Sequence, residues 1–370
     1  MKGYYLKKVL HSLLVLFVII TLNFFLPRMI FTDPAQPYFV GVPEDATALR
    51  EEIREEYGFN DPILVQYVAY LKRIATLDLG QSHYYKESVW QVMLSRIPWS
   101  MVLTVSSMVL SVALGILLGS VAGKNRNRKA DRLLLWLSGV TTAIPSFWLA
   151  MVAVMIFGFG LKWFPYRGAM TAGYTLVMNG TVFLVFFTVG VVLSILLRLF
   201  TQKSLCVFAG IPLSMLGGIF ASVPVVDIMD VAYHAFLPVM ISVFSGVIGY
   251  GLLVRNSMMA VSREDYILTA RAKGLPPSVV LYRHTFRNAM LPLITNVGMS
   301  MAGLIGGSVL MEQIFSWPGM GRLLLEACNT GDYQLSQGIL LLFAVITIAC
   351  NFVTDLVYHK CDPRVKEGAS

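Results

Sequence analysis

Few residues in this chain have the types and spacing that bond chemistry or metal binding requires. His83 and Glu87 lie four residues apart and would share one helix face, but two ligands make an incomplete metal site. Residues 119–125, Gly-Ser-Val-Ala-Gly-Lys-Asn, are similar to a phosphate-binding loop. Its glycine spacing is one residue short, and Asn stands where Ser or Thr is needed. We therefore expect no catalytic residue, no metal site and no bound cofactor.

The cysteines show no functional pattern either. The four thiols form no C-x-x-C pair and no metal spacing, and the topology below places two in membrane spans and two on opposite sides. A disulfide framework is therefore not expected. The four are Cys206, Cys328, Cys350 and Cys361.

The composition indicates a bilayer rather than water as the main solvent. Hydrophobic residues make up 56% of the chain and charged residues 14%, whereas soluble domains carry about 25% charged residues. The net charge of +8 is compatible with nucleic-acid binding. However, the Lys and Arg residues lie in short segments between long apolar runs, which is what membrane orientation produces. We therefore expect a lipid bilayer, and no nucleic acid, as the partner.

Eight apolar runs are long enough to cross a bilayer, which takes about 20 helical residues. The first run, 9–26, follows three lysines and has no small-residue cleavage site after it, so we interpret it as a retained span and not a signal peptide. The predicted spans are 9–30, 100–123, 133–160, 176–197, 204–224, 235–254, 289–311 and 337–357.

The positive charges predict the orientation. With the amino terminus in the cytoplasm, the inside segments hold most of the 29 Lys and Arg residues. Both termini are then cytoplasmic. The predicted inside segments are 1–8, 124–132, 198–203, 255–288 and 358–370.

The predicted external loop, 31–99, contains helical patterns of its own. An acidic amphipathic stretch covers 44–57 and an apolar helix-like run covers 64–74. We expect both to be short helices on the outer membrane surface. This divides the chain into 1–99, the first span with its external loop, and 100–370, the transmembrane domain proper.

The middle of each predicted span carries no carboxylate and no histidine. Ion-coupled carriers keep such groups at mid-membrane. Their absence argues that the driving energy enters elsewhere, although a secondary carrier stays open as the alternative at this point.

The longest inside segment, 255–288, predicts two helices joined by a tight break. Ser262 is a candidate N-cap with Asp265 three residues on, which predicts a helix over 263–273. Gly274 follows at the position that often adopts a left-handed conformation. Pro276 and Pro277 then prevent continuation, and Ser278 is the candidate cap of the second helix.

This capped helix has two interpretations. In the simpler interpretation, the helix lies on the lipid headgroups. The sharper one is a docking knob for a cytoplasmic partner, which the small residues Ala270, Ala272 and Gly274 favour because they allow close backbone approach.

The sequence of this segment also carries a family resemblance. Residues 263–275, Arg-Glu-Asp-Tyr-Ile-Leu-Thr-Ala-Arg-Ala-Lys-Gly-Leu, resemble the cytoplasmic EAA-type loop of the dipeptide/oligopeptide/nickel permease family of ABC importers. Residues 283–292 are similar to that family's entry into its next span. Further similar stretches, in order, are 76–82, 96–98, 143–148, 164–168, 312–321 and 362–364.

The resemblance implies a fold and a set of partners. The fold is an all-α, polytopic type I ABC importer transmembrane domain with six family spans, located in the inner or plasma membrane of a prokaryote. The partners are a second related permease subunit, two ABC ATPase subunits that use the ATP, and an extracytoplasmic solute-binding protein. The ATPase-coupling residues would be Tyr266, Thr269, Ala270, Arg271, Ala272, Lys273, Gly274 and Leu275.

Two departures from the family pattern stand out. Arg287 stands where general EAA loops carry Pro, which leaves the details of the ATPase contact open. Gly168 and His234 also lie much further apart than in the family, and two apolar runs fill the gap. We expect an inserted two-span hairpin at about 170–230, which keeps the downstream orientation because it adds an even number of spans.

The external segment after span 289–311 has two interpretations. It could gate the outer mouth of the pathway, or it could form a turn that satisfies backbone groups at the interface. The residues concerned are Glu312, Phe315, Trp317, Pro318 and Gly319. For the substrate, peptides come first, with nickel or another small solute as the alternative.

Overall fold

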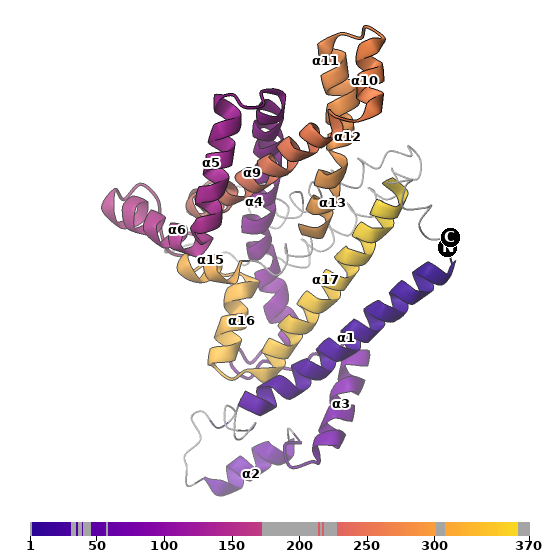
Figure 1. Cartoon of the computed structure of the whole chain (residues 1–370). Helices are drawn as coiled ribbons and strands as arrows, with labels where there is room; N and C mark the ends of the chain where they lie inside the picture. Colours follow the sequence, from indigo (N-terminus) through magenta and orange to yellow (C-terminus); the bar gives the residue numbers. More distant parts are fainter. Residues whose placement is uncertain are drawn as a thin grey trace.

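The computed structural model describes residues 2–30, 35, 39, 46–56, 58–171, 214, 217, 228–300 and 308–361. Helices dominate these ranges, and their only β feature is an isolated bridge between Gln81 and Ser88 (Figure 1). The predicted all-α class is confirmed. The predicted hairpin at about 170–230, with its spans 176–197 and 204–224, lies almost wholly outside the described residues.

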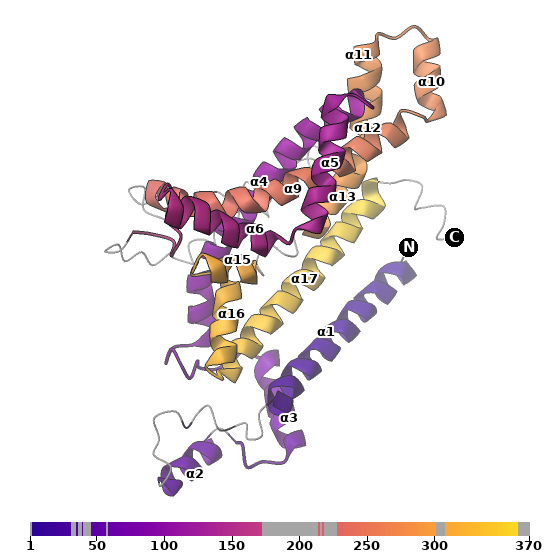
Figure 2. The same ribbon diagram turned by 60° about the vertical axis from the view of Figure 1, so that its left-hand side comes forward.

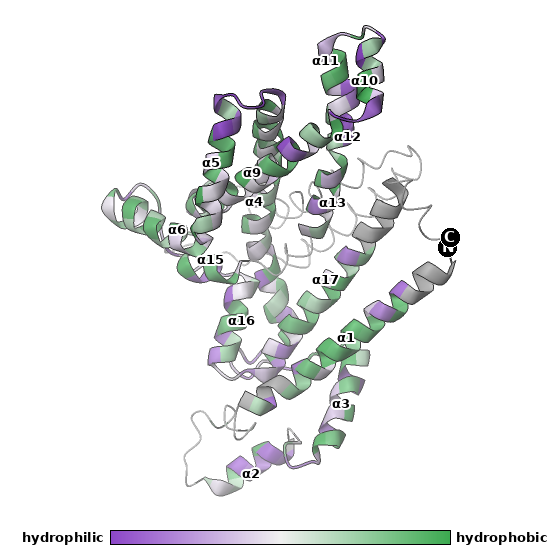
Figure 3. Ribbon diagram, in the orientation of Figure 1, coloured by the Kyte–Doolittle hydropathy of each residue, from purple (hydrophilic) through white to green (hydrophobic). Residues whose placement is uncertain are grey.

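Four long apolar helices match predicted spans. They are apolar along most of their length, and hydrophilic residues gather at their ends (Figure 3). They are α1 (Lys2–Ile30), α4 (Val89–Lys124), α9 (Ile228–Val261) and α17 (Tyr333–Cys361), which contain the predicted spans 9–30, 100–123, 235–254 and 337–357.

Helix α4 starts earlier than predicted. It runs from Val89 to Lys124 without a break and contains Pro98 in its first third. The predicted boundary between 1–99 and 100–370 therefore falls inside one continuous helix. Pro98 lacks a backbone N–H and its ring crowds the carbonyl four residues earlier, but the packing of neighbouring segments tolerates a proline inside a membrane helix.

The predicted span 133–160 is not a straight helix. Helix α5 (Lys129–Ala143) ends just before Pro145. Helix α6 (Ser146–Ala153), which the π-helix η2 (Val154–Gly160) continues, then runs at an angle of 91° to α5 (Figure 2). Ile144 is extended, with φ −108° and ψ 117°, because the ring of the following Pro145 disfavours the α conformation at the preceding residue.

The predicted span 289–311 is only partly described. Helix α13 (Leu291–Ser300) covers its first half, and residues 301–307 lie outside the described part of the chain. Ser308 is extended, and a separate helix α15 (Val309–Ile314) follows it.

The centre of the molecule is the pairing of α4 with α9, the most extensive helix contact among the described elements. Glycines allow their backbones to approach closely. A Cβ on Gly119 would stand 2.4 Å from the carbonyl oxygen of Gly251, and one on Gly115 would stand 2.6 Å from the Cβ of Tyr250. Small residues at such crossings are typical of membrane helices, whose association depends on close packing.

The turns gather at two ends of this pair (Figure 1). The α4–α5 turn and the loop from α9 to α13 lie at one end, which we call the inner end. At the opposite, outer end lie the short helices α2 (Thr47–Glu56), α3 (Ile63–Ala75) and α16 (Met320–Asn329), and α15 lies between α16 and α6. The predicted inside segments 124–132 and 255–288 thus share one end, and the two helices predicted in the external loop are confirmed at the other.

Candidate functional site

At the inner end, the loop after α9 forms the helix predicted from its sequence, with different boundaries. Helix α10 (Asp265–Ala272) has Glu264 in the N-cap position, so it starts two residues later than predicted. The predicted cap Ser262 is wrong. Ser262 directly follows α9, and it bonds back to that helix: its hydroxyl donates to the carbonyl of Met259 at 2.9 Å and its amide to the carbonyl of Met258 at 3.0 Å.

The end of α10 confirms the predicted left-handed glycine. Gly274 has a φ of +73°, and its amide donates to the carbonyl of Arg271 at 2.9 Å. A Cβ at this position would meet no atom within 4 Å. The glycine is thus required by its backbone angle and not by crowding.

A second helix follows immediately. It consists of α11 (Pro277–Val279), the π-helix η4 (Val280–Phe286) and α12 (Arg287–Ala289), with Pro276 as N-cap. The predicted cap Ser278 is wrong because it lies one residue inside the helix. Pro277 occupies the first helical position, where its fixed φ suits the helix and its missing N–H costs nothing.

Helix α10 is held against η4 along one face. Ile267 is fully buried, and Ala270 and Val280 pack beside it with at most 7% exposure. The hydroxyl of Tyr266 also accepts a hydrogen bond from the side-chain amide of Asn288 at 2.9 Å. Ala270 therefore faces its own chain, contrary to the prediction that it meets a partner.

The other predicted coupling residues are exposed, and the α10–α11 pair projects beyond the other described helices at the inner end (Figure 1). These exposed residues are Tyr266, Thr269, Arg271, Ala272, Lys273, Gly274 and Leu275.

A buried ion pair that was not predicted from the sequence joins α5 to α9 at the inner end. The fully buried Asp131, at the start of α5, accepts bonds of 2.7 and 3.1 Å from the guanidinium of Arg255, near the end of α9. The amide of Asn127 donates to the same carboxylate at 2.8 Å. The pair joins the start of α5 to the last two turns of α9. Nothing in the sequence links two residues 124 positions apart, and only their shared placement in predicted inside segments was a signal.

Toward the outer end, Glu312 is the centre of a buried cluster of hydrogen bonds, which we call the Glu312 knot. Its carboxylate has no exposed surface and accepts a 2.7 Å bond from the Ser100 hydroxyl and a 3.0 Å bond from the amide of Arg322. Burial raises the pKa of the Glu312 carboxyl above its ordinary value, although these donors oppose the rise. Gly319 lies so close that a Cβ there would stand 2.4 Å from this carboxyl group.

Trp317 connects the same cluster to Trp99 of α4, the residue directly before the predicted span 100–123. Its fully buried indole donates to the carbonyl of Trp99 at 2.8 Å, and the two rings meet edge to face at 5.7 Å. Phe315 is also buried, and its carbonyl accepts from the amide of Gly168 at 2.9 Å. The structure thus brings together all five predicted gate residues, with Pro318 the most exposed of them. Their bonds satisfy backbone groups, as the turn interpretation expected, and gating stays a prediction.

A second outer-end contact was also missed from the sequence. Asp332, fully buried before α17, accepts bonds from the Ser82 hydroxyl at 2.5 Å and from the amides of Tyr84 and Leu335 at 3.1 and 3.0 Å. It fastens the segment before α4 to the start of α17. The neighbouring His83 and Glu87 belong to no group of three or more possible metal ligands among the described residues.

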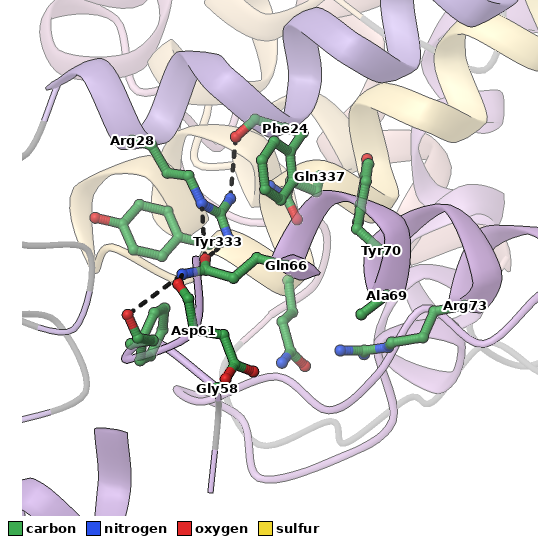
Figure 4. A pocket seen from close by; sticks show the side chains of 12 residues that line it. Phe24, Arg28, Gly58, Asp61, Gln66, Ala69, Tyr70, Arg73, Tyr333 and Gln337 are labelled. Atoms are coloured by element: carbon green, nitrogen blue, oxygen red, sulfur yellow. Dashed lines mark hydrogen bonds between the residues drawn. The ribbon is translucent and has the colours of Figure 1, made fainter. Parts of the chain in front are cut away.

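A small polar cavity lies where α1, α3 and α17 meet at the outer end (Figure 4). Its volume is about 130 Å³. The guanidinium of Arg28 donates to Gln66 at 3.1 Å and to the carbonyl of Phe24 at 3.0 Å, and it stacks 3.7 Å above the Phe24 ring. Burial raises the pKa of Tyr70 in the same wall to about 12. These contacts attach α3 to α1.

Two protein-family models match the chain. The model described as binding-protein-dependent transport system inner membrane component matches residues 115–367. Its N-terminal companion, binding-protein-dependent transport system membrane component, N-terminal, matches residues 1–104. Together they cover almost the whole chain, and they meet within α4.

Curated relatives match over nearly their full length. The oligopeptide transport system permease protein AppB of Bacillus subtilis (strain 168) is 29% identical over 99% of this chain and 100% of its own. The di/tripeptide transport system permease protein DppB of Pseudomonas aeruginosa (strain UCBPP-PA14) is 30% identical over 95% and 94%. The dipeptide transport system permease protein DppB of Alkalihalophilus pseudofirmus is 30% identical over 99% and 100%.

Proposed function

This chain belongs to the family of binding-protein-dependent transport system inner membrane components, and on that premise we propose that it is the permease subunit of an ABC importer of short peptides. The observation that carries the substrate class is the near full-length similarity to permeases named for oligopeptides, di/tripeptides and dipeptides. Family membership removes the support for the ion-coupled carrier. Nickel or another small solute stays as the alternative cargo.

The inner end is the cytoplasmic side in this proposal. It carries the basic turns 124–132 and 255–288, as the positive-inside rule requires. Both termini are then cytoplasmic, in the inner or plasma membrane of a prokaryote. The outer end, with α2, α3 and the Glu312 knot, faces an extracytoplasmic solute-binding protein that delivers the peptide.

Two ATPase subunits bind on the cytoplasmic side, and one of them contacts the exposed residues of α10. Support comes from the geometry of α10: the helix projects, one face is packed on η4, and Thr269 and residues 271–275 are exposed. A second related permease completes the pathway. The ATPase subunits use the ATP, and this chain binds no cofactor and performs no bond chemistry.

The ATPase stroke then passes from α10 to the spans through side-chain contacts. Movement of α10 pulls on η4 through Ile267 and Val280, and the Asp131–Arg255 pair makes the α5 and α9 ends move together. Because α4 and α9 pack backbone to backbone, a tilt of one carries the other. The Glu312 knot, fastened to the start of the α4 span, is the contact at which such a tilt reaches the outer end.

The test is reconstitution of the transporter as it exists in the cell. The chain is tagged in its host, purified with its bound subunits and placed in proteoliposomes with the binding protein. We expect uptake of labelled di- and tripeptides that requires ATP and the binding protein. Uptake driven by an ion gradient without ATP would contradict the importer. ATP-driven uptake of nickel chelates but not of peptides would contradict the substrate class alone.

A further inference from the structure

A cavity of about 670 Å³ lies at the inner end, between the α4–α5 turn and the α10–η4 pair. Its volume is in the range of ordinary ligand pockets, about 300–1,000 Å³. Four segments that are distant in the sequence line it: the end of α4, the end of α9, the end of α10 and the start of the second helix. It is therefore a space created by the tertiary fold and not by one loop.

The lining combines three cations with an apolar floor. Lys124 ends α4, Arg126 follows it in the α4–α5 turn and Arg271 lies on α10, while Met258, Met259 and Leu281 are among the apolar residues. No acidic residue belongs to the lining. Lys124, Arg126 and Arg271 are exposed, and the neighbouring carboxylate of Asp131 is already bonded to Arg255.

We propose that this cavity binds the phosphate headgroup of an anionic phospholipid from the cytoplasmic leaflet. The proposal rests on the orientation given above. The apolar helices α4 and α9 end at this level, which is where headgroups lie. Basic pockets between membrane helices on the cytoplasmic side are suited to anionic headgroups, and that leaflet is rich in them.

The apolar floor decides between a lipid and the other anionic occupant, an acidic surface of the ATPase. A carboxylate side chain would satisfy the cations but leave the partly exposed Met259 and Leu281 against water. A phospholipid satisfies both, since its phosphate pairs with the guanidinium and ammonium groups and its glycerol and first methylenes cover the apolar side chains. The bound lipid would also bridge Arg271 on the coupling helix to Lys124 and Arg126 on the α4–α5 turn, and so stabilise one spacing of the two.

The test counts tightly bound lipid in the assembled transporter, purified with its partner subunits and washed exhaustively with detergent. Lys124→Gln combined with Arg126→Gln removes two cavity cations. Arg128→Gln combined with Lys129→Gln removes two exposed cations from the same turn that do not line the cavity. We expect the first variant to lose about one phosphatidylglycerol per copy of the chain by mass spectrometry, and the second to keep it.

Two further arms identify the occupant and control for folding. Lys124→Arg with Arg126→Lys keeps the charge and should retain the lipid, which separates charge from any folding defect. In phosphatidylcholine nanodiscs, phosphatidylglycerol should raise the thermal midpoint of the wild type more than that of the Gln variant, and inorganic phosphate should not reproduce the rise. No transport is needed for either readout, so a wrong substrate class does not affect them.

Three results would overturn the proposal. The first is equal phosphatidylglycerol retention in the two Gln variants. The second is a thermal rise produced equally by inorganic phosphate, which would make free phosphate the ligand. The third is loss of ATPase subunits from the Lys124/Arg126 Gln variant with lipid retention unchanged, which would assign the cavity to an acidic protein surface.

Discussion

Asp131, Glu312 and Asp332 are three carboxylates without exposed surface, and each fastens segments that are distant in the sequence. Their main partners lie 124, 212 and 250 positions away. Burying a carboxylate is costly unless donors surround it, so each of these groups requires the partner segment to be in place. A single sequence contains no signal for such pairings, because each residue by itself has the ordinary features of a solvated turn.

At Glu312 the burial predicts a sign for the pH dependence of stability. The folded state holds its proton more tightly than the unfolded chain, whose carboxyl titrates at about 4.3. The contribution of this group to the free energy of unfolding is therefore largest below that value, and it falls as the pH rises through the raised pKa. Thermal midpoints of the wild type and of Glu312→Gln should be compared between pH 4 and 8.

We expect the midpoint difference, wild type minus Gln variant, to decrease as the pH rises, because Gln does not titrate. A difference that increases with pH would mean that the bonds from Ser100 and the Arg322 amide outweigh burial, so that the ionised carboxylate is the favoured form.

At Gly274 the geometry separates a backbone effect from a docking effect. Both Gly274→Ala and Gly274→Glu place a side chain at φ +73°, with a penalty of about 1–2 kcal/mol, and neither meets an atom of this chain near its Cβ. We expect the Ala variant to keep most of its peptide uptake and the Glu variant to lose it, with both inserted in the membrane. Uptake, membrane level and ATPase co-purification are measured together.

Normal uptake by Gly274→Glu would show that the ATPase does not contact this turn. Equal loss in both variants, at wild-type membrane levels, would attribute the defect to the strained turn alone and would also contradict the docking account.

At the scale of elements, the length of the apolar runs and the turn residues were sufficient to predict most helices. The remaining helix boundaries depend on tertiary contacts. The long spans α1, α4, α9 and α17 could be predicted because about 20 apolar residues leave few alternatives in a bilayer. Gly274 predicted the end of α10 to within one residue. The start of α10 could not be predicted, since the Ser262 hydroxyl can bond equally well back to the end of α9, as it does here.

The α4–α9 crossing yields a matched pair of glycine substitutions. Gly119→Ala places a Cβ 2.4 Å from a backbone oxygen of the facing helix, so the helices must separate, at a cost of about 1–3 kcal/mol. Gly249→Ala, on the exposed side of α9, meets nothing within 4 Å and gains helix propensity of up to about 1 kcal/mol. The thermal midpoint should therefore fall in the first variant and stay or rise in the second. Equal midpoints would mean that the two helices do not cross at Gly119.

At the scale of the whole molecule, the alternation of apolar runs predicted which segments share an end. Segments 124–132 and 255–288 lie together at the inner end, and the helices α2 and α3 at the outer end, as expected. The bend at Pro145 was missed because the apolar run continues through it. The faces of α10 were missed because periodicity alone does not show whether a small residue such as Ala270 packs on its own chain or on a partner.

The predicted hairpin sets the topology of the part between Gly168 and Ile228. Segment 198–203 should be cytoplasmic and 168–174 external. Single cysteines are placed as Gln202→Cys and Ala172→Cys in a background without the four native cysteines, and intact cells are treated with an impermeant thiol reagent. Position 172 should be labelled and position 202 protected until the cells are opened. The reverse pattern would eliminate the two-span insertion.

The central claim, that α10 is the contact through which an ATPase drives this permease, is tested most directly by photo-crosslinking from its exposed face. Lys273→Cys, and Asp61→Cys at the outer end as the control, are each labelled with a benzophenone maleimide in the cysteine-free assembled transporter. The account predicts an ATP-binding subunit crosslinked to position 273 and none to position 61. A complex that still hydrolyses ATP and imports peptide, but yields no ATPase crosslink from position 273, would contradict it.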